Sequence, residues 1–187
     1  MNDSVTMIRE NLDNLPSFIL ASGYSIKWYE HGDEKVWEEI QSASDRYNKI
    51  TPDLYHIEFG FNEEQLHSRQ CYILDHKGIA IGTATAWFND SYKGLPYGRV
   101  HWVAIVPTSQ GLGLAKPLMT TICERLKSIG HSRAYLTTST ARIPAINLYL
   151  MFGFAPNIVG KKDLEAWQRI QNQLKYPPRM ASGAAAG

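Results

Sequence analysis

A turn with two glycines is the part of the sequence best suited to bind a ligand through its backbone. Residues 108–113 read Thr-Ser-Gln-Gly-Leu-Gly, and they lie between an apolar stretch typical of a buried strand and an amphipathic helical pattern. The first turn of a helix leaves backbone N–H groups unpaired, with a partial positive charge. Gly111 and Gly113 let a ligand approach the backbone closely. The pattern predicts a cradle for an anion such as a diphosphate, although a tight strand-to-helix turn without a ligand has the same signature.

A proline fixes where the following helix begins. Pro117 is tolerated only in the first turn, so the helix begins no earlier than about Gly113 or Leu114. A Walker A loop would require Gly-Lys-Ser/Thr after a four-residue spacer, and this is absent. A dinucleotide-binding motif would require a third glycine where Lys116 stands. The turn therefore fits neither of these nucleotide-binding folds.

The composition is that of one globular domain. The 187 residues carry a formal net charge of +1, with 44% hydrophobic and 20% charged residues. This balance gives no global attraction to nucleic acid or to an anionic membrane. No apolar run is long enough to span a bilayer, and the N-terminus lacks the pattern of a signal peptide. We therefore expect a cytoplasmic protein without nucleic-acid or membrane partners.

The two cysteines are expected to be buried free thiols. Cys71 falls at the start of a predicted strand and Cys123 in the middle of a predicted helix. Neither has a Cys or His neighbour at the spacing of metal ligands, so we expect no metal site. Unpaired thiols suit a reducing compartment, although the sequence alone leaves a disulfide open.

The expected elements mix strands and helices, which predicts an α/β fold. In chain order we expect a short helix or arm within 3–20, a strand at 24–29, a helix from Glu34, a short helix at 63–68, strands at 72–75 and 79–88, a loop at 89–98, a strand at 99–106, the central helix, a strand at 133–139, and helices at 144–152 and 163–174. As domains, we expect an N-terminal arm at 1–20, a single domain at 21–175 and a disordered tail at 176–187.

Three segments of the second half share a spacing that is more specific than the glycine turn alone. They read Val-Ala-Ile-Val-Pro at 103–107, Gln-Gly-Leu-Gly-Leu-Ala at 110–115, and a stretch at 145–154 that contains Leu-Tyr-x-x-x-Gly-Phe. Together they resemble the GNAT superfamily of acyl-CoA-dependent N-acetyltransferases, with Ala115 standing where the motif often ends in glycine. The resemblance implies an α/β fold with a mixed, mainly antiparallel central sheet, a splayed strand, and helices on both faces.

The resemblance also implies a binding site for acetyl-CoA as cosubstrate, without a metal. In the family, the splayed strand pairs with the pantetheine arm like an added strand, while the diphosphate lies on the amides of the turn. Carried over to this chain, the pantetheine contacts are Val103, Ala104, Ile105 and Val106, and the diphosphate contacts are Gln110, Gly111, Leu112, Gly113, Leu114 and Ala115.

Acyl transfer to an amine also needs a base and a proton donor. Tyr149 matches the family tyrosine that protonates the departing thiolate, although a tyrosine packed in the core is the plain structural alternative. His101 lies, by strand alternation, on the same face as Val103 and Ile105. An unperturbed histidine has a pKa near ~6.5, which suits a base, but His101 can equally be a residue that merely fills the sheet. Glu58 and His56 are weaker candidates for the base.

One departure from the family concerns Arg142, which stands where the family often has an asparagine that contacts the pantetheine. Arg142 can reach a phosphate, reach the acceptor, or be a solvated surface residue.

The expected reaction is direct acetyl transfer to a primary amine in a ternary complex. We expect the acceptor pocket to be lined by residues 47–61, Trp87 and the loop at 89–98, whose aromatic side chains suggest a partly apolar acceptor. The amine itself is not identified, so a small-molecule amine, a peptide N-terminus and a lysine side chain all remain open. The alternatives are a non-catalytic acyl-CoA sensor or interaction module on the same fold, and an acyltransferase for longer chains. A homodimer is also left open.

Overall fold

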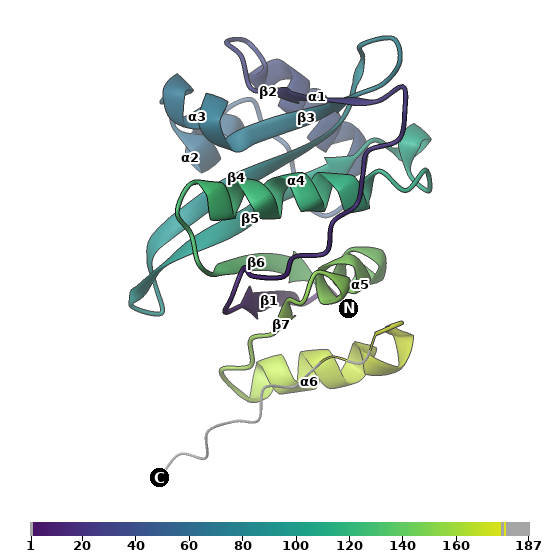
Figure 1. Ribbon diagram of the computed structural model, residues 1–187. Coiled ribbons are helices and arrows are strands. Elements are labelled where there is room, and N and C mark those ends of the chain that lie inside the picture. The colour runs from purple at the N-terminus through teal and green to yellow at the C-terminus, as the bar shows by residue number, and fades with distance from the viewer. Residues whose placement is uncertain (1, 177, 179–187) are drawn as a thin grey trace.

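The computed structural model describes residues 2–176 and 178, and its centre is a seven-stranded sheet with the order β2-β3-β4-β5-β6-β1-β7 (Figure 1). The strands are β1 (Ser4–Arg9), β2 (Ser25–Trp28), β3 (Gln70–Leu74), β4 (Ala80–Tyr92), β5 (Leu95–Ile105), β6 (Ala134–Ser139) and β7 (Ala155–Pro156). All neighbouring strands are antiparallel except β5 and β6, which are parallel. The predicted mixed, mainly antiparallel sheet is confirmed.

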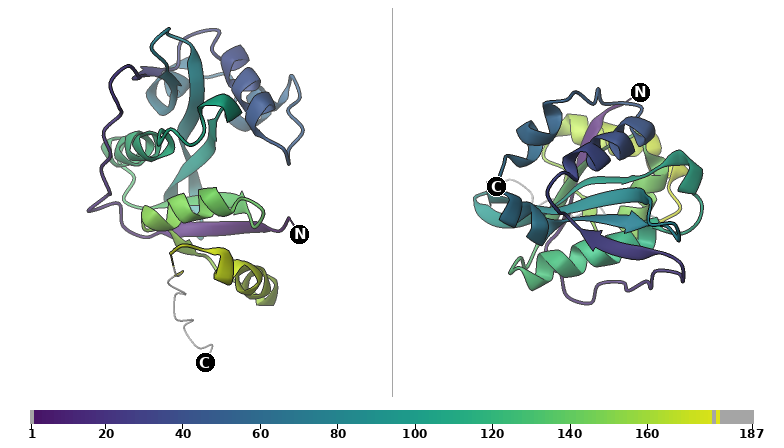
Figure 2. Two further views of the ribbon diagram at one scale, coloured as in Figure 1. Left: turned by 90° about the vertical axis from the view of Figure 1, so that its right-hand side faces the viewer. Right: turned by 90° about the horizontal axis from the view of Figure 1, so that it is seen from above.

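Helices cover both faces of this sheet, as expected. They are α1 (Glu34–Ser44), α2 (Leu54–Phe59), α3 (Glu63–Arg69), α4 (Ala115–Ser128), α5 (Ile143–Met151) and α6 (Lys161–Ile170), with 3₁₀ turns at Pro107–Ser109 and Gln171–Gln173. The two views of Figure 2 place α4 on one side of β4 and β5 and α1 on the other. Leu118 and Ile122 of α4 are fully buried in one core, and Trp37 of α1 is fully buried in the second core with Phe59 of α2.

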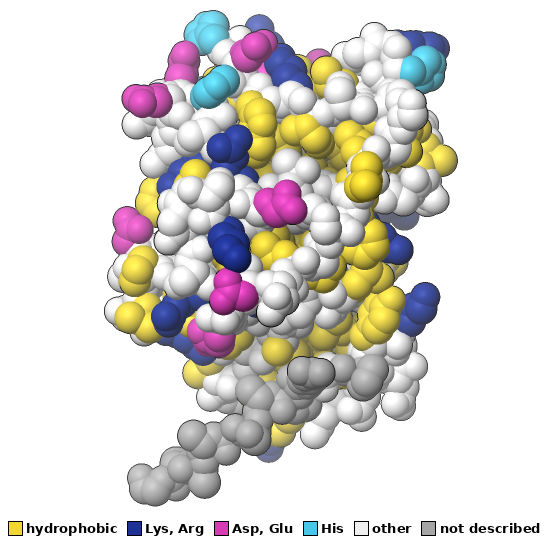
Figure 3. All heavy atoms as spheres, in the orientation of Figure 1, with side chains coloured by type: hydrophobic (Ala, Val, Ile, Leu, Met, Phe, Trp, Pro, Cys, Tyr) yellow, Lys and Arg dark blue, Asp and Glu magenta, His cyan; other side chains and the backbone are white. Residues whose placement is uncertain are grey.

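On the face shown in Figure 3, the acidic and basic side chains of the described residues are interspersed. This agrees with a net charge of +1 for the chain. Among the described residues, none of the helices is long and apolar enough to cross a membrane.

The central helix begins where Pro117 predicts. Helix α4 starts at Ala115 with Leu114 as its N-cap residue, so Pro117 lies in the first turn. Gly111 and Gly113 have φ angles of 80° and 79°, which is a conformation that glycine adopts at little cost.

The N-terminal segment differs from the expected helix or arm. Residues Ser4–Arg9 form strand β1, which pairs with β6 on one side and β7 on the other. Val5 and Met7 are buried at alternate positions, which is the period of a strand. The expectation was wrong because the six-residue strand is followed by an irregular apolar stretch, and the two together imitate a broken helical pattern.

The expected loop at 89–98 is also wrong, because β4 and β5 continue through it as a hairpin. Asn89 pairs with Tyr97 and Tyr92 with Leu95, and the turn contains Lys93 and Gly94. Tyr92 stacks on the ring of Tyr135 from β6, with ring centroids 4.0 Å apart and an interplanar angle of 4°. This contact, between residues far apart in sequence, stabilises strands whose own composition is typical of a loop.

The cysteines are buried and unpaired, as predicted for a protein without a disulfide. Burial raises the pKa of both Cys71 and Cys123 to about 12, so both thiols are protonated at neutral pH.

The last helix, expected at 163–174, ends at Ile170 and continues as a 3₁₀ turn. The predicted disordered tail at 176–187 lies outside the described residues except for 176 and 178.

Candidate functional site

The sheet opens at the point where β5 leaves β6. Within the described part of the chain, the two strands pair only at Gly98 with Ala134 and at Arg99 with Tyr135. Further along β5, the carbonyl oxygen of Ile105 accepts hydrogen bonds from the side chains of Ser44 (3.2 Å) and Gln110 (2.9 Å). The predicted splayed strand is therefore present. Its edge offers backbone groups that an extended ligand can pair with.

The glycine turn, residues 108–113, follows this open edge directly. A side chain added at Gly111 or Gly113 would meet no atom within 4 Å, and Leu112 is 58% exposed, so the turn is open to solvent. Leu114 is buried and anchors the start of α4. Helix α4 has no side-chain cap and no acidic residue in its first turn. Its N-terminal amides are therefore accessible and retain the partial positive charge that attracts an anion.

A β-bulge lies in β5 beside the opening. Thr83 pairs with Ala104 and Thr85 with His101, so Trp102 and Val103 together lie opposite one residue of β4. Trp102 has a φ angle of 49°, in the left-handed region. Such a bulge reverses the alternation of side chains beyond it.

Because of this bulge, the predicted orientation of His101 is wrong. Val103 and Ile105 pack in the core under α4, whereas Ala104 belongs to the core under α1 and α2. The ring of His101 contacts Phe59 of α2, with centroids 5.5 Å apart. His101 therefore does not share a face with Val103 and Ile105, because strand alternation holds only in a strand without an inserted residue.

His101 has a carboxylate partner that lies 43 positions away in the chain. Its Nε2 lies 2.7 Å from Oε2 of Glu58, which belongs to α2. Burial lowers the pKa of His101 to about 4, although the hydrogen bond to Glu58 opposes this. The same hydrogen bond lowers the pKa of Glu58. At neutral pH the imidazole is neutral and the carboxylate charged, so His101 donates its Nε2–H to Glu58 and leaves Nδ1 as the basic nitrogen.

Glu58 and His56 were both weaker candidates for the base, and the structure separates them. Glu58 faces His101, whereas His56 stacks on the exposed ring of Phe61 with centroids 4.2 Å apart. Both residues lie on α2, whose aromatic sequence has no clear helical pattern, so helical spacing alone does not assign Glu58 to the inner face.

Tyr149 lies on α5 and is 8% exposed. Burial raises the pKa of its phenol to about 12, while the nearby guanidinium of Arg142 opposes that rise. Among the described residues the hydroxyl has no hydrogen-bond partner. Tyr149 is thus a protonated phenol at neutral pH with its donor uncommitted, although the ring itself is part of the core.

Arg142 is not a free surface residue. It is the N-cap residue of α5, and its Nη2 donates to both carboxylate oxygens of Asp45 at 2.8 Å. The Asp45 side chain is only 4% exposed. The guanidinium also lies 5.2 Å from the centre of the Tyr47 ring.

Most of the aromatic side chains expected to line an acceptor pocket are structural. Tyr55 and Phe59 are buried against Trp37 in the second core. Tyr92 and Tyr97 belong to the far hairpin. Trp87, which contacts Phe59 with centroids 5.4 Å apart, is the predicted lining residue that stays partly exposed close to His101.

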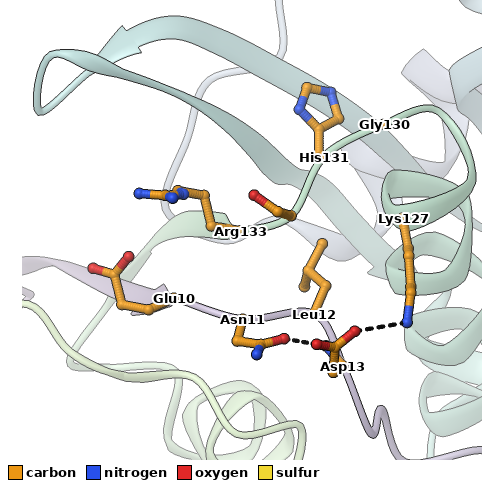
Figure 4. Close-up of a pocket in the computed structure, with 9 residues that line it drawn as sticks. Glu10, Asn11, Leu12, Asp13, Lys127, Gly130, His131 and Arg133 are labelled. Carbon is orange, nitrogen blue, oxygen red and sulfur yellow. Dashed lines mark hydrogen bonds and ion pairs between the residues drawn. The ribbon is translucent and has the colours of Figure 1, made fainter.

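The hollow shown in Figure 4 is separate from this site. It has a volume of about 350 Å³ and includes Lys127, Gly130 and Arg133 among its lining residues. Gly130 follows the C-terminus of α4, whereas the glycine turn precedes its N-terminus. A 14-residue helix is about 20 Å long. The hollow therefore lies at the other end of the helix from the glycine turn.

No metal site accompanies these residues in the part of the chain that the structure describes. Residues 2–176 and 178 contain no group of three or more His, Cys, Asp or Glu side chains arranged to hold an ion.

Comparison with known proteins now assigns the class. Residues 34–154 match the model of the acetyltransferase (GNAT) family, which is more than half of the chain, so the protein belongs to that family. The resemblance inferred from the three motif segments is confirmed. Members of this family use acetyl-CoA.

Individual relatives are more distant. The chain is 27% identical over 146 residues to mycothiol acetyltransferase of Pseudarthrobacter chlorophenolicus, and the match covers 75% of this chain and 45% of that protein. The chain thus spans less than half the length of this curated relative.

Among solved structures, a GCN5-related N-acetyltransferase from Sphaerobacter thermophilus matches with a TM-score of 0.67 at 18% identity, over 83% of this chain and 49% of that one. The ribosomal-protein-S18-alanine N-acetyltransferase of Escherichia coli matches with a TM-score of 0.60 at 17% identity, over 72% and 79% of the two chains. At these identities the structural matches establish the fold alone.

Proposed function

We propose that this protein transfers an acetyl group from acetyl-CoA to a primary amine, directly and in a ternary complex. The observation that carries the proposal is the continuity of the open edge of β5 with the exposed, uncapped glycine turn. An extended arm that ends in a diphosphate fits such a path, because the edge supplies strand-like hydrogen bonds and the turn supplies amides for the anion.

The cofactor contacts follow from this path. The backbone of Val103, Ala104, Ile105 and Val106 pairs with the pantetheine arm. The amides from Gln110 to Ala115 hold the diphosphate. The carbonyl of Ile105, which now accepts from Ser44 and Gln110, exchanges or shares these side-chain donors when the arm binds. Gln110 can then contribute its side chain as well as its amide.

The transfer step requires a base that accepts a proton from the amine and an acid that donates a proton to the sulfur. The amine nitrogen attacks the thioester carbonyl, so a C–N bond forms while the C–S bond breaks. His101 accepts the amine proton on Nδ1, directly or through a water molecule, and Glu58 at 2.7 Å from Nε2 stabilises the imidazolium that results. Because the pKa of His101 is about 4, the neutral imidazole is a weak base. It accepts the proton only after the C–N bond has largely formed, since the new bond makes the nitrogen acidic.

Tyr149 donates a proton to the departing sulfur. A thiolate leaves poorly unless a donor meets the charge that grows on sulfur in the transition state. The pKa of about 12 keeps the phenol protonated at neutral pH, and its hydroxyl has no partner among the described residues.

No cysteine takes part, because Cys71 and Cys123 are both fully buried. Two unpaired thiols also suit a reducing compartment, so we propose that the reaction takes place in the cytoplasm.

A thiol-release assay tests the proposal. The protein is incubated with acetyl-CoA and a panel of small-molecule and peptide amines, and free CoA thiol is followed. We expect release that depends on one class of amine. Binding of CoA without release on any amine would contradict catalysis and favour the sensor alternative. Release only with longer acyl-CoA donors would overturn the acetyl preference.

The matched variant for this assay is Tyr149→Phe, which removes only the hydroxyl. We expect kcat to fall roughly 10²-fold, because a general acid is lost. KM for acetyl-CoA should change little, since the lost interaction forms in the transition state. An unchanged kcat would show that Tyr149 is a core residue and that another group protonates the sulfur.

A further inference from the structure

The diverging ends of β5 and β6 are connected by side chains rather than by backbone pairing. On the β5 side, Gln41 of α1 donates to the carbonyl of Trp102 at 2.9 Å, and Ser44 donates to the carbonyl of Ile105. Asp45 follows Ser44 and is therefore fixed beside the end of β5. On the β6 side, Arg142 follows the strand closely, and its N–H donates to the carbonyl of Ser139 at 2.9 Å.

The ion pair between Asp45 and Arg142 spans this opening. The Asp45 carboxylate is oriented by the backbone N–H groups of Tyr47 (2.8 Å) and Asn48 (3.0 Å), both on Oδ1, and by the Asn48 side chain (2.7 Å) on Oδ2. Burial alone would raise the pKa of Asp45, but these hydrogen bonds and the Arg142 charge together lower it. The aspartate is therefore ionised and aimed before it meets the arginine.

Arg142 also connects the opening to Tyr149, because it begins the helix that carries Tyr149 and its charge acts on the phenol. It begins helix α5, and Tyr149 lies within the same short helix, which ends at Met151. A guanidinium near a phenol stabilises the phenolate, and Arg142 has this effect on Tyr149. Fixing Arg142 therefore fixes the start of α5 and the charge close to the phenol at once.

We propose that Asp45 and Arg142 are positioning residues for acetyl transfer, which hold α5 and its Tyr149 at a set distance from the open edge of β5. This inference rests on the proposed function. The thioester has to lie between that edge and Tyr149, so a change in the width of the opening moves the phenol away from the sulfur. A displacement of about 1 Å is enough to reduce the rate of a positioned reaction about 10²-fold.

The geometry of the pair supplies a matched set of variants. Because Nη2 alone contacts both oxygens of Asp45, a lysine can replace this contact, whereas glutamine removes the charge. Arg142→Gln is therefore the disrupting variant and Arg142→Lys its control. Asp45→Asn weakens the pair from the other side while its Oδ1 still accepts from Tyr47 and Asn48.

The experiment is a double-mutant cycle on kcat, with melting temperature and KM for acetyl-CoA measured alongside. We expect Arg142→Gln and Asp45→Asn each to lower kcat about tenfold, and the double variant to lower it about tenfold rather than about a hundredfold, because the two residues act as a unit. Arg142→Lys should stay within about threefold of the wild type, and KM should change little in all of them.

The outcomes separate the two proposals. Absence of thiol release by the wild type would already contradict the proposed function. An active wild type with unchanged kcat in folded Arg142→Gln, or with losses that multiply in the double variant, would overturn the positioning role. So would lower melting temperatures with kcat intact, since that is the pattern of a purely structural pair. If Arg142→Gln does not fold, kcat of Asp45→Asn decides, because that variant keeps the turn.

Discussion

The two ends of strand β5 differ in how their hydrogen bonds and surfaces are satisfied. At the hairpin end, β4 pairs with β5 up to Tyr92 and Leu95, β5 pairs with β6 at Gly98, and Tyr92 stacks on Tyr135. At the other end, β5 no longer pairs with β6, and the carbonyl of Ile105 accepts hydrogen bonds from the side chains of Ser44 and Gln110. Figure 1 shows these ends on opposite sides of the molecule.

The difference separates an end of the strand that stabilises the fold from an end that we propose to bind CoA. The hairpin end uses its backbone groups and aromatic surface within the protein, so it offers a ligand little. The open end leaves strand and helix amides accessible beside one another. The bulge at Trp102 lies between the hairpin end and the open end of β5. His101, which precedes the bulge, faces Glu58. Bulges next to functional sites commonly re-aim a side chain in this way.

The largest expected effect comes from placing a negative charge at the open end. Gly113→Asp should weaken CoA binding by about a hundredfold or more, because a carboxylate would lie where we propose that the diphosphate binds, and like charges repel at short range. Titration calorimetry with CoA measures the affinity. Gly113→Asn is the control, since it has the same shape and the same backbone strain at φ 79° without the charge. Equal affinities for the two variants would contradict the anion cradle.

A truncation at the hairpin end should affect stability and leave binding intact. Tyr135 is 6% exposed and stacked on Tyr92, so Tyr135→Ala should cost about 3 kcal/mol of unfolding free energy. Tyr135→Phe keeps the stack and should be close to the wild type. Urea denaturation gives the stability and calorimetry the CoA affinity. A loss of CoA affinity in the folded alanine variant would show that the two ends are coupled.

A smaller effect is expected from the titration of His101. Its pKa is about 4 in the folded protein and near ~6.5 when unfolded. The unfolded state therefore binds more protons between these values. The stability contributed by His101 is present above pH ~6.5 and is lost as the pH falls toward 4. Between pH 7 and pH 5 the loss should be about 2 kcal/mol.

Thermal denaturation of His101→Gln checks this expectation. The variant should lose much of the difference in stability between pH 7 and pH 5, while His76→Gln, at an exposed position, should keep it. An undiminished pH dependence in His101→Gln would show that other groups cause it.

The open end could be predicted from the sequence because its chemistry is local. Two glycines and a proline within seven residues determine a turn and the start of a helix. The hairpin end could not, because Asn89, Gly94 and Pro96 are typical of loops, and the tyrosine that stabilises the strands comes from β6. Tertiary contacts overrode local propensity there.

The same division holds within the candidate site. Tyr149 and His101 stand out by motif and residue type, whereas their surroundings depend on distant segments. Glu58 is 43 positions from His101, and Asp45 is 97 positions from Arg142. The bulge at Trp102 has no sequence signature, because a tryptophan with positive φ is held by its surroundings rather than favoured by its own preference. Glu58 and Asp45, the partners of His101 and Arg142, could therefore not be predicted from the sequence.

The central claim is that the open end of the sheet binds CoA, and the melting temperature of the wild-type protein tests it most directly. A ligand that binds only the folded state stabilises it by about 2.7 kcal/mol at a hundredfold excess over its dissociation constant. We expect the melting temperature to rise with CoA concentration in the wild type and to rise much less in Gly113→Asp. A wild-type melting temperature that saturating CoA leaves unchanged, with no heat of binding in calorimetry, would contradict the account.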